Sequence, residues 1–193
     1  MSIMSSPSPL DQFCVGTLVA SKYVLTSAQC VHGEEPSSLH LIIGDHDLGA
    51  SGETLIYEKR LTVQKIIIHE SYHPNTKAYD ISLLEISEAV DLGVYTPACL
   101  ASDMYGYTSD GKAAQVTSWD SAAMILFAMD APIVTNVKCS EIMNMTITPG
   151  MVCAEIHMGA DENDLCKTKV CYYNILHYNT YLKVSKTIPP TIL

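Results

Sequence analysis

Residues Cys14–Cys30 read CVGTLVASKYVLTSAQC and carry the clearest structural pattern in the chain. Two short apolar runs, 18–20 and 23–26, flank the polar pair Ser21-Lys22, which predicts a β-hairpin. A cysteine stands at each end, and a disulfide closing a loop of this length would stabilise the fold by about 3 kcal/mol. The alternative is two buried core cysteines that never meet. Because the pair brackets a hairpin in a cysteine-rich chain, the pattern favours the disulfide.

Composition limits the classes of protein to which the chain can belong. With 193 residues, 48% of them apolar, it suits one large β domain or two small barrels that share an interface. The formal charge of −10 argues against nucleic acid and anionic membranes as partners. Seven cysteines predict an oxidising compartment and leave at least one thiol without a partner in the chain. No apolar run reaches the ~18–20 residues of a membrane span, and the start has neither the basic nor the apolar region of a signal peptide.

Alternating or continuous apolar runs predict further strands along the chain. Residues 1–11 are rich in Ser and Pro and predict a disordered lead-in to a domain at 12–193. The strands are expected at 39–44, 54–59, 61–69, 79–86 and 124–129.

The hairpin also resembles a known family. Its ending, Thr26-Ser27-Ala28-Gln29-Cys30, is similar to the Thr-Ala-Ala-His-Cys that closes the first disulfide loop of trypsin/chymotrypsin-like serine endopeptidases. The resemblance implies an all-β fold of two six-stranded antiparallel barrels. The first would span about 12–97 and the second, incomplete, about 98–193, with room for a short C-terminal helix.

The same resemblance assigns two catalytic positions. Gln29 stands where the family carries its general-base histidine, and Asp80, in the run Tyr79–Ile86, stands where the family keeps the aspartate that orients this base. The alternative for Asp80 is a carboxylate that caps a turn ahead of a strand. The matching hairpin upstream favours the catalytic position.

Matches in the second half are less complete. Residues 114–120 resemble a family strand, although both glycines of its Gly-Trp-Gly are replaced here. Residues 131–139 and 147–154 also resemble family segments and imply a Cys139–Cys153 disulfide. Asp164 stands where trypsin-like members keep the acidic floor of the specificity pocket. The following residues, 167–173, read Lys-Thr-Lys-Val-Cys-Tyr-Tyr in place of Gly-Asp-Ser-Gly-Gly-Pro, so no nucleophile and no oxyanion turn are assigned. The interval between Cys166 and Tyr181 is too short for the family's intervening strands.

Four further features have a functional and a plain interpretation. Asn144-Met145-Thr146 is an N-glycosylation sequon, a tripeptide that also arises by chance. His32 could replace the missing base, but its Gly- and Glu-rich surroundings favour a solvent-facing turn. His69 and His73 have the spacing of metal ligands on a helix, but they flank a loop, and two surface histidines are the better interpretation. Cys166 and Cys171 could be reactive thiols, but we interpret them as cysteines whose partners were lost in an internal deletion. The sequence assigns no pairing to Cys99, Cys166 or Cys171.

Together these patterns predict a trypsin-like homologue without proteolytic activity. The alternatives are a fragment or isoform of an active endopeptidase that cleaves after Lys or Arg, and a splice product that does not fold. We expect no cofactor and no metal, and a protein or peptide as the class of partner; oligomeric state is not predicted. The cysteines and the resemblance imply an extracellular location, although the chain begins without a signal peptide.

Overall fold

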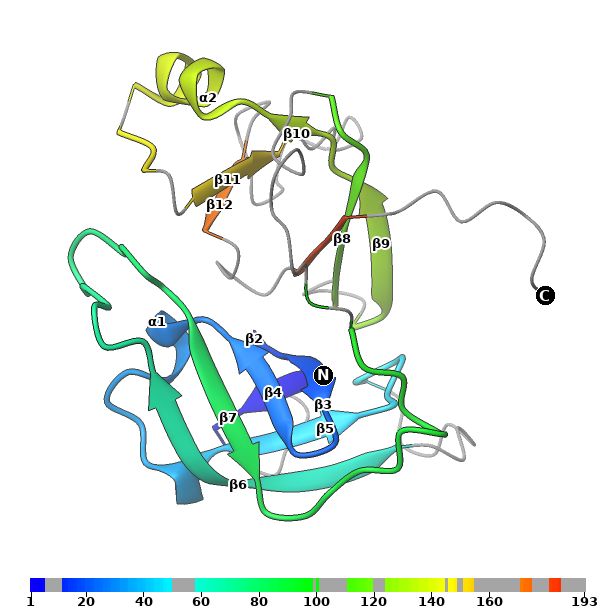
Figure 1. Ribbon diagram of the computed structural model, residues 1–193. Coiled ribbons are helices and arrows are strands. Elements are labelled where there is room, and N and C mark those ends of the chain that lie inside the picture. Colours follow the sequence, from blue (N-terminus) through cyan, green and yellow to red (C-terminus); the bar gives the residue numbers. More distant parts are fainter. Residues whose placement is uncertain are drawn as a thin grey trace.

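The computed structural model describes most of the chain in segments. They comprise residues 1–5, 12–49, 58–98, 100, 111–119, 124–144, 146–148, 151–154, 171–174 and 181–184. The expected strand at 54–59 lies almost wholly outside them, as do Cys99, Asp164 and Cys166. Figure 1 shows two halves, β1–β7 below and β8–β13 above.

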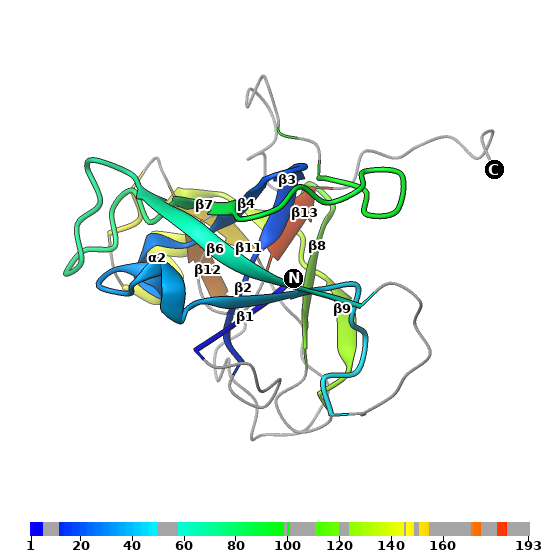
Figure 2. The same ribbon diagram turned by 90° about the horizontal axis from the view of Figure 1, so that it is seen from below.

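The first half is a closed antiparallel barrel. Its sheet has the order β2-β1-β5-β6-β7-β4-β3. The strands are β1 (Ser2–Met4), β2 (Gln12–Val15), β3 (Thr17–Ala20), β4 (Tyr23–Thr26), β5 (His40–Ile43), β6 (Lys59–Ile68) and β7 (Ser82–Ile86). β2 and β3 are the two ends of this order and flank Gly16 in the chain, so they act as one bent strand that closes a six-stranded barrel. Figure 2 shows these strands from below.

Gly16 permits this closure because it has no side chain, and a larger residue would collide with its neighbours. A Cβ at this position would lie 2.5 Å from Cγ1 of Val24 and 3.4 Å from Cδ1 of Ile3. The Gly16 N–H donates to the Met1 carbonyl at 2.8 Å, and the Met1 amino group donates to the Gly16 carbonyl at 3.0 Å. The bend therefore keeps its hydrogen bonds to Met1, the residue before β1, while two strands pass within contact distance.

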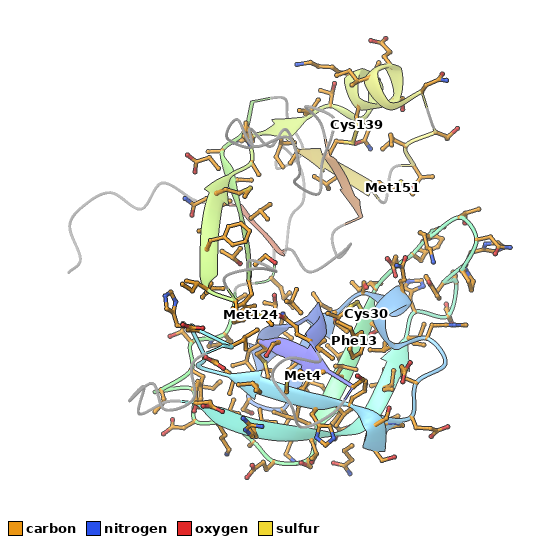
Figure 3. The ribbon with its side chains drawn as sticks, turned by 180° about the vertical axis from the view of Figure 1, so that it is seen from behind. Met4, Phe13, Cys30, Met124, Cys139 and Met151 are labelled. Carbon is orange, nitrogen blue, oxygen red and sulfur yellow. A yellow bond between two sulfur atoms is a disulfide. The ribbon has the colours of Figure 1, made fainter. Side chains whose placement is uncertain are left out.

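The barrel interior follows from the alternation of the strands. β7 reads Ser-Leu-Leu-Glu-Ile and buries every second residue. The shared core contains Ile3, Leu18, Val24, Leu41, Leu61, Leu84 and Ile86. The predicted Cys14–Cys30 disulfide is confirmed, with a Cα–Cα distance of 6.1 Å. Both cysteines pack on this core, and Phe13 and Met4 lie nearby in Figure 3.

The N-terminus departs from the predicted disordered lead-in. Ser2–Met4 form β1, which pairs with β2 on one side and with β5 on the other. Ile3 is fully buried in the core. Three residues ahead of a Ser- and Pro-rich segment give little local signal, and the two neighbouring strands supply the pairing. Residues 6–11 lie outside the described part.

The second half contains two three-stranded sheets, ordered β13-β8-β9 and β10-β11-β12. Its elements are β8 (Ala114–Trp119), β9 (Leu126–Asp130), β10 (Ile133–Val134), α2 (Asn136–Met143), β11 (Met151–Ala154), β12 (Cys171–Asn174) and β13 (Tyr181–Val184). The interval between Cys166 and Tyr181 therefore does hold one strand, β12, although it looked too short for the family's set. No barrel closes among the described strands of this half, so the predicted all-β class with an incomplete second barrel is confirmed. The expected C-terminal helix falls on undescribed residues.

The halves meet at a short backbone junction. The Leu48 N–H donates to the Met124 carbonyl at 3.0 Å, and the Leu126 N–H donates to the His46 carbonyl at 2.8 Å. Asp47 and Ile125 form an antiparallel bridge between these two bonds. Met124 lies beside the first barrel in Figure 3. None of the helices in the described segments is long and apolar enough to span a membrane.

Candidate functional site

The site begins where β4 ends and the chain turns into α1 (Ala28–Val31). The Thr26 hydroxyl, fully buried, donates to the Val15 carbonyl at 2.9 Å and fixes the end of the strand. Ser27 then caps α1, because its Oγ accepts the Cys30 N–H at 3.3 Å. Ala28 and Val31 are buried. This single helical turn lies on the side of the barrel nearest the second half (Figure 1) and carries Gln29.

Asp80 meets this turn from far along the chain. Its Oδ1 accepts the backbone N–H of Gln29 at 2.7 Å across a separation of 51 residues, and only 4% of the residue is exposed. A carboxylate here satisfies one of the N–H groups that a helix leaves unpaired at its start. The structure therefore brings together the two positions that the sequence assigned to base and aspartate, and it also gives Asp80 a capping function.

The side chain of Gln29 is in an unusual state. Its Oε1 is buried and has no hydrogen-bond donor among the described residues. A buried carbonyl without a donor loses the hydration it had in the unfolded chain. An amide oxygen is also too weak a base to accept a proton near neutral pH. The side chain of residue 29 thus ends in an acceptor that cannot perform acid–base chemistry.

Tyr72 is a site residue that the sequence did not single out. Burial, and in second place the negative charge of Asp80, raise the pKa of its hydroxyl. Its ring lies 5.5 Å from that of His32, centroid to centroid. Only its place in the polar loop between two strands could have drawn attention to it. His32 is exposed on the turn after α1, as the plain interpretation predicted.

His69 and His73, the two histidines considered above as metal ligands, stabilise the loop that leads to Asp80. Nδ1 of His69 accepts the Ser71 N–H at 3.1 Å, and Nδ1 of His73 accepts the Thr76 N–H at 3.4 Å. The His69 ring also stacks on Tyr79, with centroids 4.9 Å apart. Both histidines are exposed, in agreement with the plain interpretation. In the segments that the structure covers, no three His, Cys, Asp or Glu side chains are grouped so that they could hold a metal ion.

The remaining predicted positions lie in the second half. Cys139 and Cys153 form the expected disulfide, with a Cα–Cα distance of 6.3 Å, which attaches α2 to β11. Asn144 is exposed directly after α2. Asp164 and residues 167–170, where the family's nucleophile would be sought, lie outside the described residues, as does the side chain of Cys171.

Comparison with known proteins shows the family to which this chain belongs. The family described as Trypsin matches residues 1–167. The chain belongs to the trypsin family. The match begins at residue 1, in agreement with a barrel whose first strand is Ser2–Met4.

Individual trypsin-family relatives align over most of this chain at modest identity. Serine protease filzig of Drosophila melanogaster is 29% identical over 80% of this chain and 10% of its own length. Chymotrypsin-like elastase family member 1 of Macaca fascicularis is 29% identical over 73% of this chain and 55% of its own. Trypsin-1 of Astacus astacus is 27% identical over 78% and 66%. The chain thus spans only part of the length of these relatives.

Proposed function

We propose that this chain is a trypsin-family protein without peptidase activity. The observation that carries the proposal is the contact between Asp80 and residue 29. The carboxylate that would orient a base is in place, 2.7 Å from the backbone of residue 29, but the side chain there is an amide. At the position that the resemblance assigns to the base, the chain therefore carries a side chain that cannot take a proton.

The chemistry of acyl transfer makes this loss decisive. A serine nucleophile needs a base to take its proton, a carboxylate to hold the base, and N–H donors for the oxyanion. Losing a member of such a unit costs on the order of 10⁶ in turnover, and several losses within one unit are not additive. Residues 167–173 add to the proposal at the level of sequence, because they lack the Gly-Asp-Ser-Gly-Gly pattern that would supply nucleophile and oxyanion turn.

A protein of this kind acts through binding, in an extracellular setting. Two disulfides, Cys14–Cys30 and Cys139–Cys153, support an oxidising compartment. The partner class that suits a trypsin-like surface is a protein or peptide, and the formal charge of −10 disfavours nucleic acid.

A second candidate is a fragment or isoform of an active endopeptidase that cleaves after Lys or Arg. The retained Asp80, the acidic Asp164 and the partial coverage of the relatives favour it. The two candidates differ in what the present chain does on its own.

The test is an activity measurement on the oxidised, folded chain. We expect no hydrolysis of Arg- or Lys-ester substrates above buffer and no labelling by a fluorophosphonate probe. Gln29→His is the matched variant, because it restores an imidazole at the position that Asp80 faces. If both forms are inert, the nucleophile is missing as well as the base. Stoichiometric serine labelling of the wild type would overturn the proposal, and activity appearing in Gln29→His alone would limit the defect to residue 29.

A further inference from the structure

The loop after α2 presents an asparagine to solvent in an accessible form. Asn144 ends α2 in the left-handed region, with φ 49° and ψ 42°. Asn144 and Thr146 are both exposed. No hydrogen bond of the Asn144 side-chain amide is found within the described part of the chain. The amide nitrogen therefore has no competing partner there.

The surroundings hold this loop in position from both sides. The Cys139–Cys153 disulfide fixes α2 to β11 ahead of the loop. Nδ2 of Asn136 donates to the Thr148 and Met151 carbonyls at 3.1 and 3.0 Å. The Ile147 N–H donates to Oγ of Ser140 at 3.3 Å. Helix α2 and residues 147–148, on either side of the sequon, are thus held together by hydrogen bonds.

The sequon lies at a position where a glycan would not interfere with the barrel core or the candidate site. Asn144-Met145-Thr146 is the one Asn-X-Ser/Thr tripeptide with X other than Pro in the 193 residues. Figure 1 shows α2 at the end of the second half remote from α1, and Figure 3 likewise separates Cys139 from Cys30. A bulky group at Asn144 would therefore clear both the barrel core and the site at residues 29 and 80.

We propose that Asn144 is an N-glycosylation site of this protein when the chain enters a secretory compartment. The donor class is an oligosaccharide linked through a diphosphate to a membrane lipid. In the transfer, Nδ2 of Asn144 forms a bond to C1 of the first sugar, and the bond from C1 to the diphosphate oxygen breaks. The electron pair of that bond leaves on the lipid diphosphate, and Nδ2 gives up one proton to a base of the transferase. The product is an exposed, solubilising N-linked glycan.

The experiment expresses the full chain behind a secretory leader in mammalian cells and compares its gel mobility before and after peptide N-glycosidase. We expect one glycosidase-sensitive shift, and mass spectrometry of the released peptide should show Asp in place of Asn at position 144. Thr146→Ala should abolish the shift without altering the left-handed residue itself. Thr146→Ser should keep the mobility shift, because serine also completes the sequon. Asn75→Gln should keep the shift as well, because Asn75 is exposed but does not belong to a sequon.

Two results would overturn the proposal. One is a secreted wild-type chain whose mobility and mass the glycosidase leaves unchanged. The other is a shift that persists in Thr146→Ala and Asn144→Gln, which would locate the glycan elsewhere. Neither result bears on peptidase activity, so this inference and the proposed function succeed or fail independently.

Discussion

At residue 29 the backbone and the side chain have separate functions. The N–H group holds the Asp80 carboxylate at 2.7 Å, while the amide oxygen at the end of the side chain is buried without a donor from the described residues. The first contact stabilises the fold, and the second feature costs free energy. A buried polar group left unsatisfied destabilises by roughly 1–3 kcal/mol.

Gln29→Met should therefore raise the free energy of unfolding by about 1 kcal/mol, since it keeps the length of the side chain and removes the unsatisfied oxygen. Gln29→Glu should lower the free energy of unfolding, since it places a second carboxylate beside Asp80. Urea unfolding of the oxidised protein at neutral pH measures both variants against wild type. A loss of stability in Gln29→Met would mean that Oε1 has a donor outside the described residues.

At the scale of the element, the bend between β2 and β3 controls closure of the first barrel. The bend is one residue, Gly16, whose hydrogen atom faces the Val24 side chain at the point where a Cβ would lie 2.5 Å from it. Val24 is itself fully buried. Closely packed strands cannot move apart without losing their ladder bonds, so a larger residue at the bend has to displace Val24 or open the seam.

Gly16→Ala should lower the free energy of unfolding by about 1–3 kcal/mol through overpacking. Val24→Ala alone should also destabilise, because it leaves a cavity. The double variant should cost less than the sum of the two, because the cavity accommodates the new methyl group. Denaturant unfolding of all four forms gives the coupling energy. Additive losses would show that the bend tolerates a side chain in another way.

Local patterns predicted several elements well and others poorly. The hairpin of β3 and β4 follows from alternation and two polar turn residues, and β6 and β7 follow from their Val-, Ile- and Leu-rich runs. β1 was missed, because its three residues are strand only through pairing with β2 and β5. The helix α2 was missed as well, because its residues lack a clear apolar face and a Thr135 cap is its main signal.

In the candidate site, too, some features were predicted from the sequence and others were missed. The meeting of residues 29 and 80 was predicted from the resemblance of two short motifs, and no property of either motif alone requires it. The backbone character of their hydrogen bond was not predicted, because sequence patterns identify side chains and not the group that makes a contact. The proximity of Tyr72 to Asp80 depends on the path of loop 69–79, which sequence periodicity does not specify.

At the scale of the molecule, the two halves differ in whether the described strands at the edges of their sheets have a neighbour on both sides. In the first half every strand has two neighbours once β2 and β3 are taken as one. In the second half β10, β12, β9 and β13 are the outer strands of their sheets among the described residues. Outer strands carry unpaired N–H and C=O groups and open more readily than enclosed ones.

Amides of β4 and β7 should accordingly exchange their hydrogens more slowly than those of the outer strands β9 and β10, because the closed barrel opens only with its core. Hydrogen exchange followed by mass spectrometry on oxidised, monodisperse protein resolves the two halves by peptide. Equal and strong protection of both would show that the second half is enclosed in the whole protein. The comparison is internal to one sample, so solvent conditions affect both halves alike.

The hydrogen bond between Asp80 and residue 29 has a consequence for descent. Every amino acid except proline has the N–H group that this bond uses. A single codon change can therefore replace a histidine at position 29 without a penalty from this contact, and a later change can reverse it. In a lineage of such proteins, chemistry can be lost and regained at this position while the backbone contact with Asp80 is kept, and only a proline there would abolish that contact.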